Sequence, residues 1–320
     1  MRRRRTIDWI AVGQAALHDQ IRHADLLALG LSSSAITRRV HAGTWARSGY
    51  GVISLAGRPR TREQRWAAAV LYAGPGAVLS GVAAARLHGL ERVPGDAEGA
   101  ALVLIDHGRH RISRPPVTIE RTHRLPTPIV VDGLPIAPVV RAVLDAARRL
   151  VDLDEIRALL AEAVQRGKAS VRALRTELDQ GCQRGTSRVR QVLGELEDGV
   201  RSVPEAWARS LVAAIPQLST MVWNPRLVLE DGTWLADPDG WMDDVGLAWE
   251  IHSFRHHADP AAFDATMRRH ARMTGREVHV VAHTPRQLRD DRATVRADLL
   301  AAYAVAARRP RPAVRALPPR

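Results

Sequence analysis

One acidic segment constrains the fold of this 320-residue chain more than any other stretch. Residues 235–253, LADPDGWMDDVGLAWEIHS, contain a Pro-Asp pair, a short acidic turn and an apolar run that ends in Glu-Ile-His. An apolar run of this length is typical of a buried strand, in which Glu250 and His252 share a face because side chains alternate. A turn predicted at residues 240–244 would place Asp239 beside Glu250. Two such carboxylates form a site suited to Mg²⁺ or Mn²⁺.

The order of these residues resembles the PD-(D/E)xK nuclease superfamily, in particular its very-short-patch-repair-like branch. The resemblance implies that Asp239 and Glu250 bind metal. His252 stands where that superfamily has a lysine that positions the attacking water, and the only lysine of this chain is Lys168, far outside the segment. In the same branch a glutamate on the first helix approaches the metal, which implies a third acid at Glu205, although a capping-box role also accounts for that residue. The implied catalytic set is therefore Asp239, Glu250, His252 and Glu205.

The N-terminal part of the chain has the pattern of three helices followed by a hairpin, over residues 6–57. The third predicted helix carries Ile36 and Val40 inward at i, i+4 spacing and presents hydroxyls and arginines on its other side. A short helix with these features suits contacts in the major groove of DNA. The strand, turn and strand that follow in residues 45–55 form a predicted wing.

Two runs in this part, ITRRVHAGTWARSGYGVISLAG and AAAVLYAGPGAVLSGVAAARLHGL, resemble the N-terminal region of the AbiEi-type antitoxins of type IV toxin–antitoxin systems. Those antitoxins are winged helix-turn-helix transcriptional regulators. The resemblance implies contacts with double-stranded DNA from Ser33, Ser34, Thr37, Arg38, Arg39, Arg47 and Tyr50. It extends to a middle region and a nuclease-like domain behind it, and so covers nearly the whole chain.

The predicted fold class is α/β, an α+β multidomain chain whose C-terminal mixed sheet is flanked by helices. Its parts are a winged helix at 1–60, a mixed α/β middle region at 61–200, a nuclease-like domain at 201–307 and a disordered Pro/Arg-rich tail at 308–320. The middle region has predicted helices at 63–73, 77–89, 138–149, 153–166, 169–179 and 186–199, and strands at 101–105, 116–120, 129–131 and 134–136. We assign no functional site to the middle region.

The net charge of +13 and the isoelectric point near 11.3 favour an anionic partner, with nucleic acid first. A GC-rich coding bias that replaces lysine by arginine explains the same charge equally well, so charge alone does not select the partner. The single cysteine, Cys182, excludes a disulfide framework within the chain and fits a reducing cytosol. The uncharged run at 66–85 is interrupted by Gly74-Pro75-Gly76, so we expect no membrane span and a cytoplasmic protein.

Together these features predict a DNA-binding transcriptional regulator of the AbiEi type, whose nuclease-like domain keeps the fold but no longer cleaves. A Mg²⁺- or Mn²⁺-dependent DNA endonuclease is the first alternative. A protein that neutralises a cognate toxin is the second. Zinc is not expected, because no zinc-ligand spacing occurs among the histidines of the C-terminal part. Those histidines are His252, His256, His257, His279 and His283.

Overall fold

The computed structural model describes residues 7–49, 51–59, 61–94, 100–198, 202–252 and 260–318. The chain divides into two compact units, Met1–Leu196 and Glu197–Arg320. The division falls close to the boundary that the sequence predicts near residue 200. Helices and strands are mixed in both units, and the predicted α+β multidomain class is confirmed.

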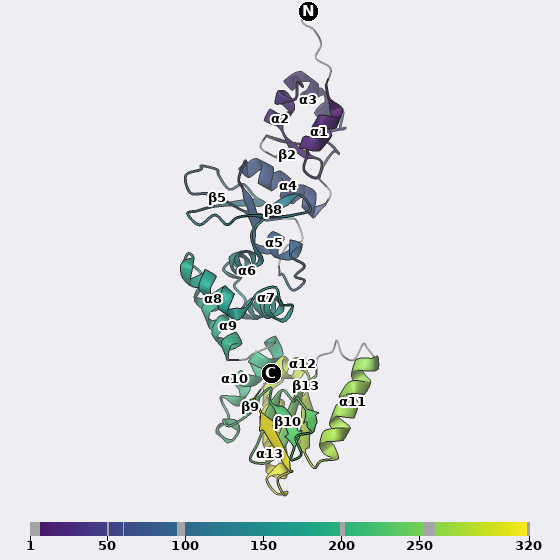
Figure 1. Cartoon of the computed structure of the whole chain (residues 1–320), viewed down its shortest axis with the longest axis vertical. Helices are drawn as coiled ribbons and strands as arrows, with labels where there is room; N and C mark the ends of the chain where they lie inside the picture. The colour runs from purple at the N-terminus through teal and green to yellow at the C-terminus, as the bar shows by residue number, and fades with distance from the viewer. Residues whose placement is uncertain are drawn as a thin grey trace, which may run out of the picture. The chain divides into compact units, whose positions relative to one another are not determined.

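The first unit begins with a winged helix-turn-helix (Figure 1). Its elements are α1 (Trp9–Ala15), β1 (Gln20–Arg22), α2 (His23–Ala28), α3 (Ser33–His41), β2 (Ala46–Gly49) and β3 (Val52–Ser54). The three strands form an antiparallel sheet in the order β1-β3-β2, in which β1 was not predicted from the sequence. Ile21, Leu26, Ile36 and Ile53 are fully buried between the helices and this sheet. The three predicted helices and the hairpin are therefore present.

A five-stranded sheet follows, in the order β6-β5-β4-β8-β7. Its elements and the first helices around it are α4 (Arg62–Ala73), β4 (Val78–Ser80), α5 (Gly81–Leu87), β5 (Ala101–Asp106), β6 (Val117–Thr122), β7 (Ile129–Val131) and β8 (Leu134–Ile136). The predicted helix at 77–89 is wrong over its first residues, because Val78–Ser80 is the central strand. A short, wholly apolar stretch has no periodicity that separates a buried strand from a buried helix.

Four more helices complete the first unit: α6 (Val139–Ala147), α7 (Leu153–Gln165), α8 (Val171–Gln180) and α9 (Ser187–Glu197). Helix α4 packs on the five-stranded sheet and also contacts the winged-helix sheet, while α5 and α6 pack together against β4. A second core of leucines and valines joins α6 to α7, α8 and α9. The middle region is thus a sheet with helices layered behind it.

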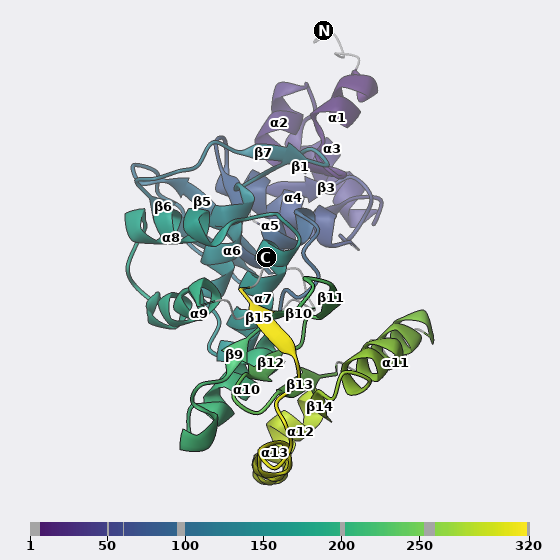
Figure 2. The same ribbon diagram turned by 60° about the horizontal axis from the view of Figure 1, so that its bottom comes forward.

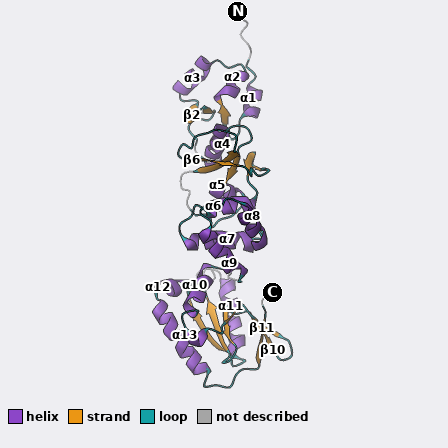
Figure 3. Ribbon diagram, turned by 90° about the vertical axis from the view of Figure 1, so that its left-hand side faces the viewer, coloured by secondary structure: helices purple, strands orange, loops and turns teal. Residues whose placement is uncertain are grey.

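The second unit contains a four-stranded mixed sheet, in the order β14-β13-β12-β9, with helices on both sides (Figure 3). Its elements are α10 (Val203–Val212), the 3₁₀ turn η1 (Pro216–Leu218), β9 (Val222–Trp223), β10 (Arg226–Leu229), β11 (Trp234–Ala236), β12 (Gly240–Met242), β13 (Leu247–Ile251), α11 (Pro260–Thr274), β14 (His279–His283), α12 (Pro285–Asp290), α13 (Arg292–Ala306) and β15 (Val314–Leu317). Along β13, Leu247 and Trp249 face α10, α12 and α13, whereas Ala248 faces the opposite core beside Met273 of α11. Glu250 shares the face of Ala248 because side chains alternate.

The C-terminal residues contradict the prediction of a disordered tail at 308–320. Strand β15 pairs antiparallel with β10 from Arg226↔Leu317 to Leu229↔Val314, and Figure 2 shows it as a yellow strand alongside β10. Val314 is 1% exposed within the core around Trp241. The abundance of proline and arginine suggested disorder, but the alternating apolar positions Val314 and Ala316 are enough to close a sheet edge.

None of the helices within the described ranges has both the length and the apolar run needed to cross a bilayer.

Candidate functional site

The outer face of α3 is the first candidate site. Ser32 caps the helix by accepting a hydrogen bond from the backbone N–H of Ala35 at 3.2 Å, which starts the helix at Ser33. Ser33, Ser34 and Arg38 are exposed, and Thr37 is half-buried on the same side. These four residues therefore present hydroxyls and one cation to solvent, as the sequence predicted.

Arg39 differs from its neighbour Arg38 in its surroundings. Its guanidinium carbon lies 4.8 Å from the ring centre of Trp9 and 5.1 Å from that of Trp45. The two indoles meet edge to face with their centres 6.5 Å apart. Because Trp9 belongs to α1 and Trp45 precedes β2, Arg39 joins α3 to both through cation–π contacts. This arginine holds the helix in place as well as adding charge.

The wing adds a second cationic surface. Arg47 on β2 is exposed, and Tyr50 lies outside the described residues. Beside the wing is a cavity of about 440 Å³ whose lining includes Arg47, Arg58, Arg65 and Arg114. From residue 26 to residue 62 the chain has no aspartate or glutamate. The helix and the wing thus form a continuous stretch of sequence with positive charge alone.

The second candidate site lies at the ends of β12 and β13. Gly240 pairs with Trp249 in the antiparallel register, so Asp239 and Glu250 are the next residues along the two strands. The Oδ2 atom of Asp239 accepts a hydrogen bond from the backbone N–H of Ile251 at 2.6 Å. The predicted proximity of the two acids is present, but the predicted turn at 240–244 is misplaced: residues 240–242 are a strand and the turn occupies 243–246.

Glu250 is an unusual carboxyl group because it is only 3% exposed. Its Oε2 atom accepts a hydrogen bond from Nη2 of Arg269 on α11 at 2.8 Å. Its Oε1 atom is buried and has no hydrogen-bond partner among the residues that the structure describes. Burial raises the pKa of Glu250 to about 7, with the cation of Arg269 opposing the rise and the charge of Asp239 adding to it.

Two histidines approach the same carboxyl group. Ligand atoms of Glu250, His252 and His270 all lie within 4.8 Å of one another, and the two imidazole centres are 5.0 Å apart. Burial and the neighbouring Arg269 lower the pKa of His270, which keeps its imidazole neutral, as metal binding requires. One carboxylate and two imidazoles fit Mn²⁺ or Zn²⁺ better than Mg²⁺, which prefers oxygen ligands. The sequence analysis missed His270, whose approach depends on how α11 packs.

Glu205, the implied third acid, lies in a different environment from Glu250. Its carboxylate is buried and its Oε1 atom accepts hydrogen bonds from Nη2 of Arg209 at 2.9 Å and from Nδ2 of Asn224 at 2.5 Å. The backbone N–H of Asn224 donates to the carbonyl of Asp239 at 2.9 Å. Glu205 therefore supports the strand end that carries Asp239, and the cluster of possible metal ligands found among the described residues does not include it.

The remaining histidines of the second unit lie apart from this cluster or outside the described residues. Nδ1 of His283 accepts a hydrogen bond from the indole N–H of Trp249 at 3.0 Å, and Nε2 lies 3.3 Å from Asp298. These contacts give His283 a role in the core. His256 and His257 lie outside the described residues.

Comparison of the chain with protein-family models and with curated proteins finds no match in either. The resemblances to AbiEi-type antitoxins and to PD-(D/E)xK nucleases therefore stay predictions.

Proposed function

We propose that the chain binds double-stranded DNA through its winged helix and acts as a transcriptional regulator. The observation that carries this proposal is the outer face of α3, where Ser33, Ser34 and Arg38 are exposed and stand beside a cationic wing. In a winged helix, the helix in this position enters the major groove and the wing follows the phosphate backbone.

The two surfaces have different tasks under this proposal. Arg38 has a planar donor fork that matches the O6 and N7 acceptors of guanine, and the serine hydroxyls accept or donate to base edges or phosphates. Arg47 contributes charge near the backbone, which raises affinity without sequence preference. Specificity then resides on α3 and a large share of the affinity on the wing.

The test is to select duplexes from a random pool with the full chain and to repeat the selection with Arg38→Ala. Wild type should enrich a defined motif, and the variant should lose preference at one or two base pairs while still binding duplex. A wild-type pool that remains random, or a variant with an unchanged motif, would contradict base recognition by α3.

A second candidate function rests on the cluster of Glu250, His252 and His270. We propose that Mn²⁺ or Zn²⁺ bound there would supply a polarised water for phosphodiester hydrolysis. Glu250 would hold the ion, and Asp239 would stand beside it as a second carboxylate. The ion pair between Glu250 and Arg269 has to open for the carboxylate to use both of its oxygens.

Plasmid cleavage tests this second function directly. Wild type is incubated with supercoiled DNA and Mg²⁺, Mn²⁺ or Zn²⁺, beside Asp239→Ala, Glu250→Ala and the matched control Glu230→Ala, an exposed acid of the same unit. Nicking by wild type and Glu230→Ala, but not by the other two variants, is the expected result. An intact plasmid in every lane with every ion would leave DNA binding as the function and remove cleavage.

A further inference from the structure

A cationic cavity in the middle region has no part in either function proposed above. It encloses about 760 Å³, within the range of small-molecule sites. Its wall comes from the end of β6, from α6 and from the segment after α8, which the sequence separates widely. The arginines that line it are Arg121, Arg124, Arg141, Arg148, Arg149 and Arg184.

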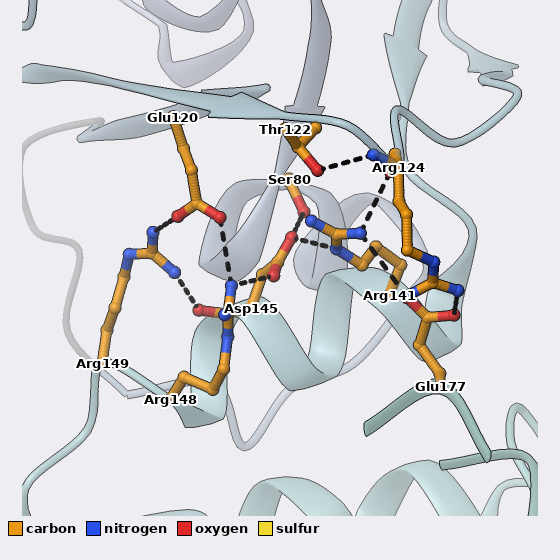
Figure 4. A network of polar contacts seen from close by, with 9 residues as sticks. All are labelled: Ser80, Glu120, Thr122, Arg124, Arg141, Asp145, Arg148, Arg149 and Glu177. Atoms are coloured by element: carbon orange, nitrogen blue, oxygen red, sulfur yellow. Dashed lines mark hydrogen bonds and ion pairs between the residues drawn. The ribbon is translucent and has the colours of Figure 1, made fainter. Parts of the chain in front are cut away.

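One buried carboxylate, that of Asp145, fixes the direction of the inner arginines (Figure 4). Asp145, only 1% exposed, accepts from Nε of Arg141 at 2.9 Å and from Nη2 of Arg148 at 2.6 Å. The hydroxyl of Ser80 donates to the same carboxylate at 2.7 Å. Burial disfavours the charge of Arg148, but the carboxylates of Asp145 and Glu120 together raise the pKa of its guanidinium. Both guanidinium groups are thus held in place by the same carboxylate.

Further ion pairs hold the arginines nearer the opening of the cavity. Glu120 accepts from Arg148 at 3.2 Å and also from Arg149. Burial alone would raise the pKa of Glu120, yet these two guanidinium groups lower it. Across the cavity, Glu177 binds both Nη atoms of Arg124, at 3.1 and 2.9 Å. Four of the six lining arginines are therefore held by carboxylates.

The positive charge of the cavity exceeds the negative charge that holds it. Six arginines line it, against the three carboxylates of Asp145, Glu120 and Glu177. Arg121 and Arg184 make no ion pair with a carboxylate among the described residues, and both are exposed at the rim. Nη1 of Arg121 lies 3.3 Å from Nδ1 of His110, so the charge of neither cation is neutralised by a carboxylate within the described residues.

We propose that this cavity binds linked phosphate groups of a small molecule, either a nucleotide or a free polyphosphate. A preorganised guanidinium donates two parallel hydrogen bonds to phosphate oxygens, so several arginines around one cavity match a chain of phosphates better than a single small anion. The proposal is independent of DNA binding by α3, because none of the residues involved belongs to the winged helix.

Cys182 provides the measurement. It is exposed, lines the cavity and is the single cysteine of the sequence, so a neutral maleimide reports on this site alone. Labelling of the full chain is followed with inorganic triphosphate, with ATP, with a short DNA duplex, and with NaCl at matched ionic strength. Triphosphate or ATP should slow labelling about tenfold relative to NaCl, and their order of potency distinguishes the two sources.

Variants make the result specific. Arg184→Ala and Arg121→Ala should each weaken protection by triphosphate about tenfold, because each removes charge-assisted hydrogen bonds. Arg172 is an exposed arginine of α8 outside the cavity, so triphosphate should protect Cys182 of the Arg172→Ala variant as it does in wild type. Melting temperatures check that the variants are folded. Equal labelling rates in triphosphate and NaCl would overturn the proposal, and so would protection by duplex alone or an equal loss in the Arg172→Ala variant.

Discussion

The surface formed by α3 and the wing in the first unit and the carboxylate–histidine cluster of the second use charge in opposite ways. On the surface, Arg38 and Arg47 are exposed and no acid occurs from residue 26 to residue 62. In the cluster, Glu250 is buried next to Asp239, and among the described residues its carboxylate pairs with a cation, Arg269. Exposed charge recruits a polyanion, whereas buried charge is held ready to bind an ion or a proton. Each of the following predictions tests one side of this contrast.

The largest expected effect is on the pH dependence of stability. The pKa of Glu250 is about 7 in the folded chain against an ordinary value of 4.5. As pH rises from about 4.5 to about 7, the unfolded carboxyl ionises while the folded one keeps its proton. The free energy of unfolding should therefore fall by on the order of 3 kcal/mol across this window.

Urea denaturation at a series of pH values measures this fall. Glu250→Gln should flatten the curve between pH 5 and 7 and be more stable than wild type above pH 7. Glu230→Gln, which changes an exposed acid of the same unit, should follow the wild-type curve. A Glu250→Gln curve that keeps the wild-type slope would show that this carboxyl does not titrate as described.

The next effect concerns DNA. Replacing both Arg38 and Arg47 by alanine should weaken duplex binding about 30-fold at low salt and reduce the slope of log K against log salt by about 2. Fluorescence anisotropy over a range of salt concentrations measures both quantities. Glu250→Gln is the contrasting variant, and its affinity should equal that of wild type. An equal loss of duplex affinity in Glu250→Gln would show that the two regions do not act separately.

A smaller effect is expected from metal ions. At ten times its dissociation constant, Mn²⁺ or Zn²⁺ should raise the unfolding free energy by about 1.4 kcal/mol. At a fixed ion concentration the gain should be larger at pH 8 than at pH 6, since the ion competes with the proton of Glu250. Thermal melts of His270→Ala should lose the gain. His279→Ala, on β14 outside the cluster, should keep it, and a gain that persists in His270→Ala would place the ion elsewhere.

The smallest effect separates two adjacent arginines. Arg39→Ala should lower the unfolding free energy by about 1 kcal/mol, because it removes the cation–π contacts with Trp9 and Trp45. Arg38→Ala should change it by less than about 0.5 kcal/mol. Denaturant melts of the two variants provide the comparison. Equal stabilities would mean that the stacking of Arg39 contributes nothing.

Local signals were sufficient for much of this architecture. Ile36 and Val40 at i, i+4 spacing predict α3, and the apolar run that ends before Glu250 predicts β13. The proximity of Asp239 and Glu250 also followed from one antiparallel pairing. These features depend on residues close together in the sequence.

Contacts between distant segments account for what the sequence did not predict. Val78–Ser80 becomes the central strand only because β5 and β8 pair with it on either side. His270 reaches Glu250 because α11 packs on the sheet, and Val314 is ordered because β10 offers a free edge. The cationic cavity needs β6, α6 and the end of α8 together. Each of these arrangements joins residues that lie far apart in the sequence, so no local pattern predicts it.

The stacking of Arg39 between two indoles has a consequence for how the protein can evolve. Helix α3 is packed in place by Arg39 and by buried Ile36. Substitution of Ser33, Ser34 or Arg38 therefore leaves its packing intact. If α3 reads DNA as proposed, substitutions at these exposed positions change the recognised sequence at little cost in stability. In this helix the residues that are exposed for contacts differ from those that stabilise the fold, although Arg38 and Arg39 are adjacent in the sequence.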